Sequence, residues 1–120
     1  MYKILVVDDA GFMRKMVQTH LNKAGYDNFI EGADGQQAVD LYREQNPDLV
    51  IMDITMPNLD GIEALRQIKT EDPEAKIVMC SAMGQESMVM EAIKLGALDF
   101  IVKPFKQERI IQTVSKILPL

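Results

Sequence analysis

The sequence has only one cysteine and no long apolar run, and both absences limit what the chain can be. Cys80 has no second cysteine to pair with, so an internal disulfide is excluded and a reducing compartment is indicated. No stretch approaches the roughly 20 apolar residues that a membrane-spanning helix needs. The apolar run near the N-terminus is also too short for a secretory signal. We therefore expect a cytoplasmic protein without a membrane partner.

Basic residues are also scarce relative to acidic ones. The chain has 13 Lys and Arg against 18 Asp and Glu, a net charge of −5, which disfavours nonspecific binding to nucleic acid or anionic lipid. Its 120 residues are 48% hydrophobic and 26% charged, an ordinary balance for one globular domain. We expect a single domain over residues 1–120, monomeric and with no nucleic-acid partner.

Short apolar segments rich in β-branched residues alternate five times with segments of helical period. The predicted strands are 3–7, 28–33, 49–53, 76–81 and 99–102. The helical stripes between and after them are Met13, Val17, Leu21 and Ala24 before Gly25; Ala38, Val39 and Tyr42 before Pro47; Ile62, Leu65 and Ile68 before Pro73; Met88, Ala92 and Ile93 before Gly96; and Ile110, Ile111, Val114, Ile117 and Leu118. Asp60 and Glu63 have the spacing of a capping box at the start of the third helix.

Strict strand–helix alternation predicts parallel strands joined by right-handed crossovers, with helices on both faces of the sheet. Five units are too few to close a barrel. We therefore predict an α/β fold of the flavodoxin-like (βα)5 type, with a doubly wound five-stranded parallel sheet in the order 2-1-3-4-5. This order places the first and third strands side by side.

Three carboxylates follow these two neighbouring strands. Asp8 and Asp9 end the first apolar run, and Asp53 ends the third. Since α/β folds place their sites at the carboxyl edge of the sheet, the three side chains are expected to meet there. Crowded carboxylates repel one another and raise one another's pKa values unless a hard cation shares them. Mg²⁺ takes oxygen ligands, and the sequence therefore predicts a magnesium site.

Two further strands end in residues that suit the same chemistry. The fourth ends in Ser81, a hydroxyl followed by a small alanine, and the fifth is followed by Lys103 and Pro104. Each of these residues alone is more often an ordinary turn or cap. Together with a divalent metal, however, a carboxylate nucleophile, a hydroxyl and an ammonium suit the transfer of a phosphoryl group onto an aspartate.

The motifs that carry these residues resemble a known family. V-D-D at 7–9, D-I-T-M-P-N-L-D-G at 53–61, S-A at 81–82 and K-P-F at 103–105 are similar to the receiver domain of bacterial two-component response regulators. The resemblance covers the whole chain in order and spacing. Within the family, the surrounding stretches most resemble the stand-alone chemotaxis regulators, which carry no effector domain.

The resemblance assigns roles to the acidic residues and their neighbour. It implies that Asp53 is the phosphoacceptor and that a histidine kinase of the chemotaxis type is the phosphoryl donor. It also implies that Mg²⁺ is bound by the carboxylates of Asp9 and Asp53 and by the backbone carbonyl of Thr55, while Asp8 holds a metal-bound water.

The resemblance also gives roles to residues on the other loops of this edge. Ser81 would hydrogen-bond the phosphoryl group and Lys103 would pair with it. Pro104 would follow a cis peptide bond that directs Lys103 inward. Pro57 and Gly61 would shape the loop after Asp53.

Switching and partners are implied in the same way. Phosphorylation would draw Ser81 toward Asp53, and Phe100 would rotate inward into the vacated space. The face made by the fourth helix, fifth strand and fifth helix would then bind a flagellar motor switch protein, and a dedicated phosphatase could act on the site. Met90 lies off the core stripe of its helix and could join that face with Lys94, Ile101 and Lys106.

Other functions are disfavoured by particular positions. A phosphatase with an aspartyl nucleophile needs a general acid two residues after it, where this chain has Thr55. A flavin-binding module needs a phosphate-binding loop after the first strand, where Asp8 and Asp9 would repel a phosphate. Within the family, a stand-alone phosphorelay receiver, or a receiver domain excised from a larger response regulator, is the alternative. The end of the chain just after the last helix favours the stand-alone form.

Overall fold

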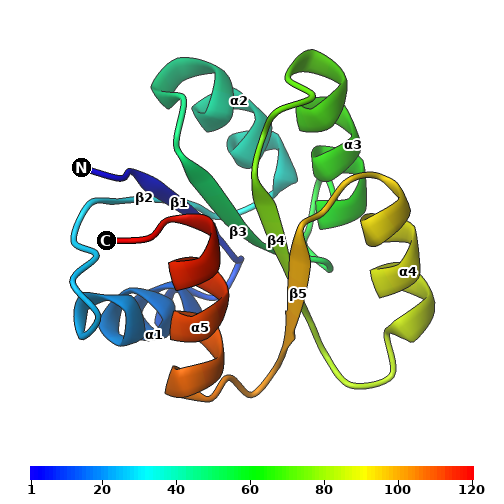
Figure 1. The fold of residues 1–120 in the computed structure, drawn as a ribbon. Coiled ribbons are helices and arrows are strands. Elements are labelled where there is room, and N and C mark those ends of the chain that lie inside the picture. Colours follow the sequence, from blue (N-terminus) through cyan, green and yellow to red (C-terminus); the bar gives the residue numbers. More distant parts are fainter.

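The computed structural model describes all 120 residues, and the predicted alternation of strands and helices is present throughout (Figure 1). In chain order the elements are β1 Ile4–Val7, α1 Gly11–Asn22, β2 Phe29–Gly32, α2 Gly35–Gln45, β3 Leu49–Asp53, α3 Gly61–Glu71, β4 Ile77–Ser81, α4 Glu86–Lys94, β5 Asp99–Val102 and α5 Gln107–Ile117. All strand pairs are parallel, and the order β2-β1-β3-β4-β5 confirms the predicted flavodoxin-like topology.

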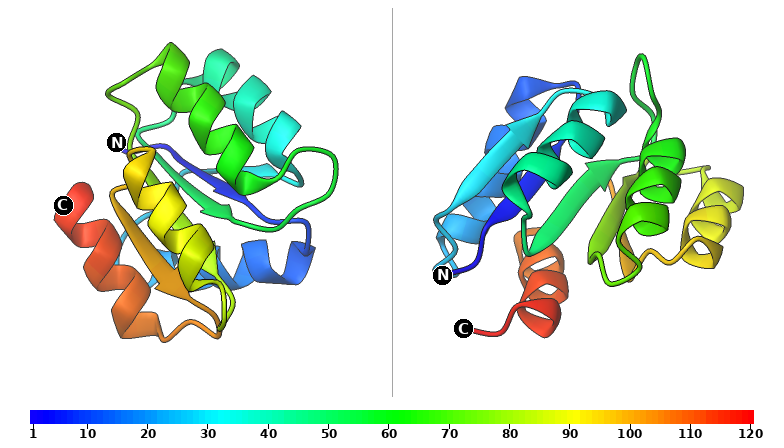
Figure 2. Two further views of the ribbon diagram at one scale, coloured as in Figure 1. Left: turned by 90° about the vertical axis from the view of Figure 1, so that its right-hand side faces the viewer. Right: turned by 90° about the horizontal axis from the view of Figure 1, so that it is seen from above.

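The helices form one layer on each face of the sheet. Helices α1 and α5 contact each other on one face, while α2, α3 and α4 lie in sequence on the other (Figures 1 and 2). Both faces are covered, which explains why the central strands are continuously apolar rather than alternating. No helix has the length and apolarity that crossing a membrane would require.

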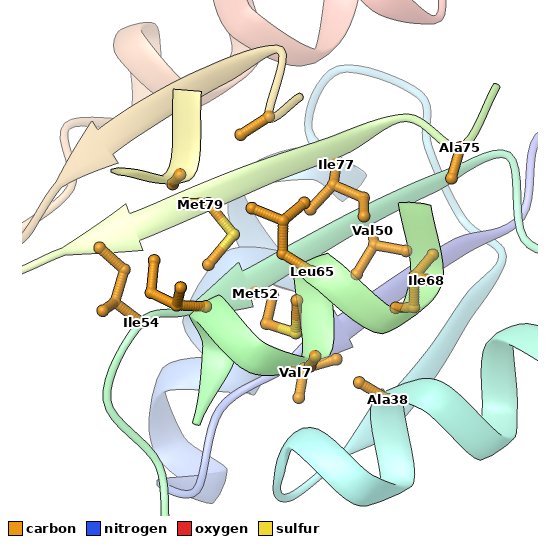
Figure 3. Packing of buried hydrophobic residues seen from close by; sticks show 14 of the residues in the cluster. Val7, Ala38, Val50, Met52, Ile54, Leu65, Ile68, Ala75, Ile77 and Met79 are labelled. Carbon is orange, nitrogen blue, oxygen red and sulfur yellow. The ribbon is translucent and has the colours of Figure 1, made fainter. Parts of the chain in front are cut away.

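Each strand sends alternate side chains to the two layers. Val50 and Met52 of β3 join the larger core under α2, α3 and α4, together with Leu65 of α3 (Figure 3). Leu49 and Ile51, their neighbours in the strand, join the smaller core under α1 and α5. Because the side-chain period of a strand is two, one buried strand supplies both cores.

The stripe predicted for α4 is confirmed at Ala92 but wrong at Met88 and Ile93. Met88 and Ile93 are 43% and 42% exposed, whereas Val89 and Ala92 are buried. Both pairs are apolar, so the pattern of residue types does not distinguish them. Only a narrow face of α4 contacts the sheet, and the helix turns its smaller residues toward it.

The capping box predicted for α3 forms only in part. Asp60 is the N-cap, and its side chain accepts a hydrogen bond from the Glu63 backbone N–H at 2.9 Å. The Glu63 side chain does not return the bond. It instead accepts hydrogen bonds from the Arg66 and Gln67 side chains.

The packing of α3 on the sheet leads to a stability prediction. Replacement of the fully buried Leu65 by Ala should lower the free energy of unfolding by about 3 kcal/mol, because the residues around the cavity relax only in part. Leu98, which is 52% exposed, provides a matched control. Leu98→Ala should change the free energy of unfolding by only about 0.5 kcal/mol. Urea unfolding followed by circular dichroism measures both values. Equal losses in the two variants would contradict this description of the core.

Candidate functional site

Three carboxylates converge at the carboxyl edge of the sheet, as predicted. One oxygen from each of Asp8, Asp9 and Asp53 lies within 4.8 Å of the others. They meet because β1 and β3 are paired, with Val7 opposite Met52, so the two strands end side by side. Asp8 and Asp53 are only 6% and 8% exposed, whereas Asp9 faces solvent. The cluster is thus buried on one side and open on the other.

The ammonium group of Lys103 lies between the two buried carboxylates. Its Nζ is 3.0 Å from Asp8 Oδ2 and 3.1 Å from Asp53 Oδ2. The peptide bond between Lys103 and Pro104 is cis. A lysine from the loop after β5 therefore contacts acids carried by β1 and β3.

Burial and charge act in opposite directions on this cluster. Burial raises the pKa of Asp53 above its ordinary value, although Lys103 pulls the pKa down in part. Burial alone would lower the pKa of Lys103, but its contacts with Asp8 and Asp53 outweigh this effect and raise that pKa. The lysine is therefore held in its charged form. A buried carboxylate beside a fixed cation is a usual feature of functional sites.

The end of β4 lies next to this cluster. Asp53 is paired with Cys80 across β3 and β4, so Ser81 is one position beyond that pair and is 1% exposed. Burial raises the pKa of the Cys80 thiol, which makes it an inert, small apolar side chain. Thr55 is exposed, and its hydroxyl accepts a hydrogen bond from Gln85 Nε2 at 2.9 Å.

The loop after β3 is held by close backbone contacts. Gly61 N–H donates to the Ile54 carbonyl at 2.7 Å, and a Cβ on Gly61 would lie 2.0 Å from the Asp53 carbonyl oxygen. Pro57 is exposed in the middle of this loop, and its carbonyl accepts from Leu59 N–H at 2.8 Å. The absence of a side chain at residue 61 is what lets the start of α3 approach the end of β3.

The same loop is also anchored on α2, which the sequence analysis missed. The Asp34 side chain caps α2 by accepting from Gln37 N–H at 2.8 Å, and its other oxygen accepts from Asn58 Nδ2 at 2.7 Å. These bonds lower the pKa of Asp34. Asp34 before Gly35 is a cap signal in the sequence, but its second partner lies on a distant loop.

Arg14 is a second residue that the sequence analysis missed. Its Nη1 donates to the backbone carbonyl of Asp8 at 2.6 Å, and its Nε pairs with Glu31 Oε1 at 2.7 Å. The arginine thus fixes the turn that presents Asp8 and Asp9. Its one sequence signal is a position one turn into α1, which does not distinguish it from an ordinary exposed arginine.

A mostly apolar groove of about 420 Å³ opens beside the site, between α4 and β5. Its lining includes Ser81, Val89, Met90, Phe100 and Val102. It thus connects the end of β4 with the exposed side of α4.

The prediction that Ile101 belongs to this outer face was wrong. Ile101 is 1% exposed and packs in the core under α1 and α5. Side chains alternate along a strand, so Val102, 41% exposed, and the half-buried Phe100 face outward instead. Met90, 60% exposed, and the exposed Lys94 and Lys106 lie on the outside, as expected.

The donor set fits a hard divalent cation. Three carboxylate oxygens within 4.8 Å of one another suit Mg²⁺, which is bound by oxygen atoms and keeps several waters. The exposed side of Asp9 leaves room for those waters. Residue 55 is a threonine, so no carboxylate stands two residues after Asp53 to act as a general acid. The arrangement favours a carboxylate that accepts a group over an enzyme that turns over phosphate esters.

Sequence comparison identifies the family. The family described as the response regulator receiver domain matches residues 4–115. The chain therefore belongs to the response regulator receiver domains, and its fold and acidic cluster are those of a regulatory phosphoacceptor rather than a conventional enzyme.

Individual relatives define the class more narrowly. Chemotaxis protein CheY of Bacillus subtilis is 55% identical over 117 residues, covering 98% of each chain. Chemotaxis protein CheY of Thermotoga maritima is 52% identical over 115 residues, covering 96% of each. The crystal structure of the receiver domain of NtrX from Brucella abortus superposes with a TM-score of 0.89 at 37% identity, covering 96% of this chain and 97% of that one. The chain is a CheY-like receiver.

The close contact at Gly61 predicts a clear effect of substitution. Gly61→Ala should lower the free energy of unfolding by about 2 kcal/mol or more, because the new Cβ would collide with the backbone of Asp53 and Ile54. Gly11→Ala is the matched control, since a Cβ there would meet only the Arg14 side chain at 3.5 Å, and it should change the value by about 0.5 kcal/mol. Urea titrations measure both. A Gly61→Ala protein as stable as the parent would refute the close approach.

Proposed function

We propose that Asp53 accepts a phosphoryl group from a histidine kinase in a reaction that depends on Mg²⁺. The observation that supports this most directly is the buried Asp53 carboxylate, held 3.1 Å from Lys103 Nζ beside Asp8 and Asp9. In this assignment the carboxylates of Asp9 and Asp53 and the Thr55 carbonyl bind the metal, and Asp8 holds a metal-bound water. When bound, Mg²⁺ neutralises charge on the phosphoryl oxygens.

The chain's own residues account for the rest of the transfer. An oxygen of Asp53 attacks phosphorus, so a P–O bond forms while the P–N bond of the donor phosphohistidine breaks and its electron pair remains on the imidazole. Lys103 is charged and already in contact with Asp53, so it can pair with the phosphoryl oxygens without reorganisation. The Ser81 hydroxyl, at the end of the neighbouring strand, donates to one of these oxygens.

The added charge then changes the outer face of the molecule. A phosphoryl group carries about −1.5 to −2 charge and draws Ser81 toward Asp53. Phe100 and Ser81 both line the groove between α4 and β5, so movement of Ser81 makes room for the Phe100 ring to turn inward. The face made by α4, β5 and α5 thereby changes shape.

The relatives supply the class of partner. By likeness to the chemotaxis proteins named above, the kinase is of the chemotaxis type and the partner that binds this face is a flagellar motor switch protein in the cytoplasm. A dedicated phosphatase is a further partner. Membership in a phosphorelay, with transfer from Asp53 to a second histidine protein, is the alternative. Loss of label from the phosphorylated protein to a histidine phosphotransfer domain, with no binding to motor switch proteins, would favour it.

Phosphorylation of Asp53 can be tested with a small-molecule donor. With acetyl phosphate and Mg²⁺, the parent protein should gain the mass of one phosphoryl group, and Asp53→Asn should gain none, because its amide is not a nucleophile. Intact-mass spectrometry measures the change. Asp60→Asn is the matched control, because asparagine is also a good N-cap and should leave the labelling intact. Stoichiometric labelling of Asp53→Asn would refute the assignment.

Binding of the motor partner can be tested at the groove. In the presence of beryllofluoride and Mg²⁺, Met90→Ala should weaken binding of a flagellar motor switch protein about tenfold, since an exposed apolar side chain is lost from the contact. Met16→Ala, a half-exposed methionine on α1, should bind within about twofold of the parent. Isothermal titration calorimetry gives both affinities. Equal weakening by the two variants would show that the groove is not the contact.

A further inference from the structure

Gln85 joins the two loops that follow Asp53 and Ser81. Its Oε1 accepts a hydrogen bond from the backbone N–H of Ala82 at 2.7 Å, and its Nε2 donates to Thr55 Oγ1 at 2.9 Å. One side-chain amide therefore connects the start of the loop after β4 to the loop after β3. The two loops are 30 residues apart in the sequence.

The Gln85 side chain bonds the two loops and not the helix that it precedes. Gln85 is the N-cap residue of α4, but its side chain does not cap the helix, whereas Asp34 and Asp60 do cap α2 and α3. The amide is used between the two loops instead.

The segment between β4 and α4 has little else to hold it. Ala82, Met83 and Gly84 are exposed, and a Cβ on Gly84 would meet nothing within 4 Å. The bond from Gln85 Nε2 to Thr55 is the only side-chain hydrogen bond that this segment forms with the rest of the protein, and the bond to Ala82 joins the two ends of the segment. The position of the segment therefore depends on Gln85.

The bond to Ala82 conflicts with the movement of Ser81. The peptide unit between Ser81 and Ala82 is planar, so a backbone movement of Ser81 toward a phosphoryl group on Asp53 carries the Ala82 N–H along with it. Such a movement displaces the N–H from its position 2.7 Å from Gln85 Oε1, and Gln85 is itself held by its bond to Thr55 on the other loop. The bridge is thus made in the arrangement without phosphoryl and strained or broken in the other.

We propose that Gln85 is a positioning residue that latches the loop after β4 in the unphosphorylated arrangement and so sets how far the switch equilibrium is shifted by phosphorylation. The proposal rests on the proposed function, because it takes Asp53 as the phosphoacceptor and Ser81 as the group that moves. A ligand shifts a two-state equilibrium only by its differential affinity for the two states. A latch that stabilises only the unphosphorylated state therefore reduces the shift in the equilibrium that the phosphoryl group produces.

The latch can be tested with beryllofluoride, which mimics a phosphoryl group on Asp53. Gln85→Met keeps the length of the side chain and removes its amide, and Thr55→Val removes only the hydroxyl. Gln36→Met is the matched control, since Gln36 is exposed on α2 and bonds only Asp40. The dissociation constant for Mg²⁺ alone is measured first in every protein by NMR titration, followed by that for beryllofluoride at saturating Mg²⁺.

The latch predicts tighter binding when the bridge is removed. Gln85→Met should bind beryllofluoride about fivefold more tightly than the parent, the gain expected when one or two neutral hydrogen bonds no longer stabilise the competing state. Thr55→Val should gain about twofold, the double variant should match Gln85→Met, and Gln36→Met should match the parent. The Ala82 amide proton of Gln85→Met should also shift upfield before any ligand is added, which a general loss of stability would not produce.

Other results would overturn either the latch or the proposed function, and the two cases can be told apart. Unchanged or weaker beryllofluoride binding in Gln85→Met, or additive effects of the two substitutions, would overturn the latch while leaving the phosphoacceptor intact. Failure of the parent protein to bind beryllofluoride at all would instead overturn the proposed function.

Discussion

The site depends on one interaction, the sharing of a single ammonium group by two buried carboxylates. Burial raises the pKa of Asp53 because an isolated buried charge is costly, and the nearby ammonium group of Lys103 offsets part of this effect. The cation comes from the loop after β5, a strand that lies two strand spacings or about 10 Å from β3. The Lys103 backbone N–H donates to the Ser81 carbonyl at 2.8 Å, and the Lys103 side chain is long enough to reach from there past the end of β4 to Asp53. The strand order therefore makes this site possible, because it brings the lysine after β5 within reach of the acids that follow β1 and end β3.

Sequence reasoning predicted the fold and the acidic cluster because both follow from strong local signals. Five apolar runs with intervening helical stripes leave few topologies, and the order 2-1-3-4-5 brings Asp8, Asp9 and Asp53 together without further information. The errors concern neighbouring apolar residues of which only one is buried in the core. Met88 and Val89 in α4, and Ile101 and Val102 in β5, differ only in which side of the element faces the core.

Other features could not be predicted because they join parts of the chain with no local pattern. Asp34 bonds Asn58, Arg14 bonds the Asp8 carbonyl and Gln85 bonds Thr55, and the sequence around each residue gives no sign of that distant partner. Such contacts arise only after the sheet has brought the loops to one edge. They hold in place the residues that the sequence did reveal.

The ion pairs of Glu31 have a consequence beyond the turn that Arg14 fixes. β2 is an edge strand of the sheet and is paired only with β1. Its outer backbone N–H and C=O groups could therefore pair with a strand of another chain. It is only four residues long, and Glu31, exposed near its end, holds both Arg14 and Lys15 beside it. A short edge strand with charged side chains is a usual protection against aggregation. The contact that orients the acidic turn thus also keeps charged side chains beside this strand, which disfavours its pairing with another chain.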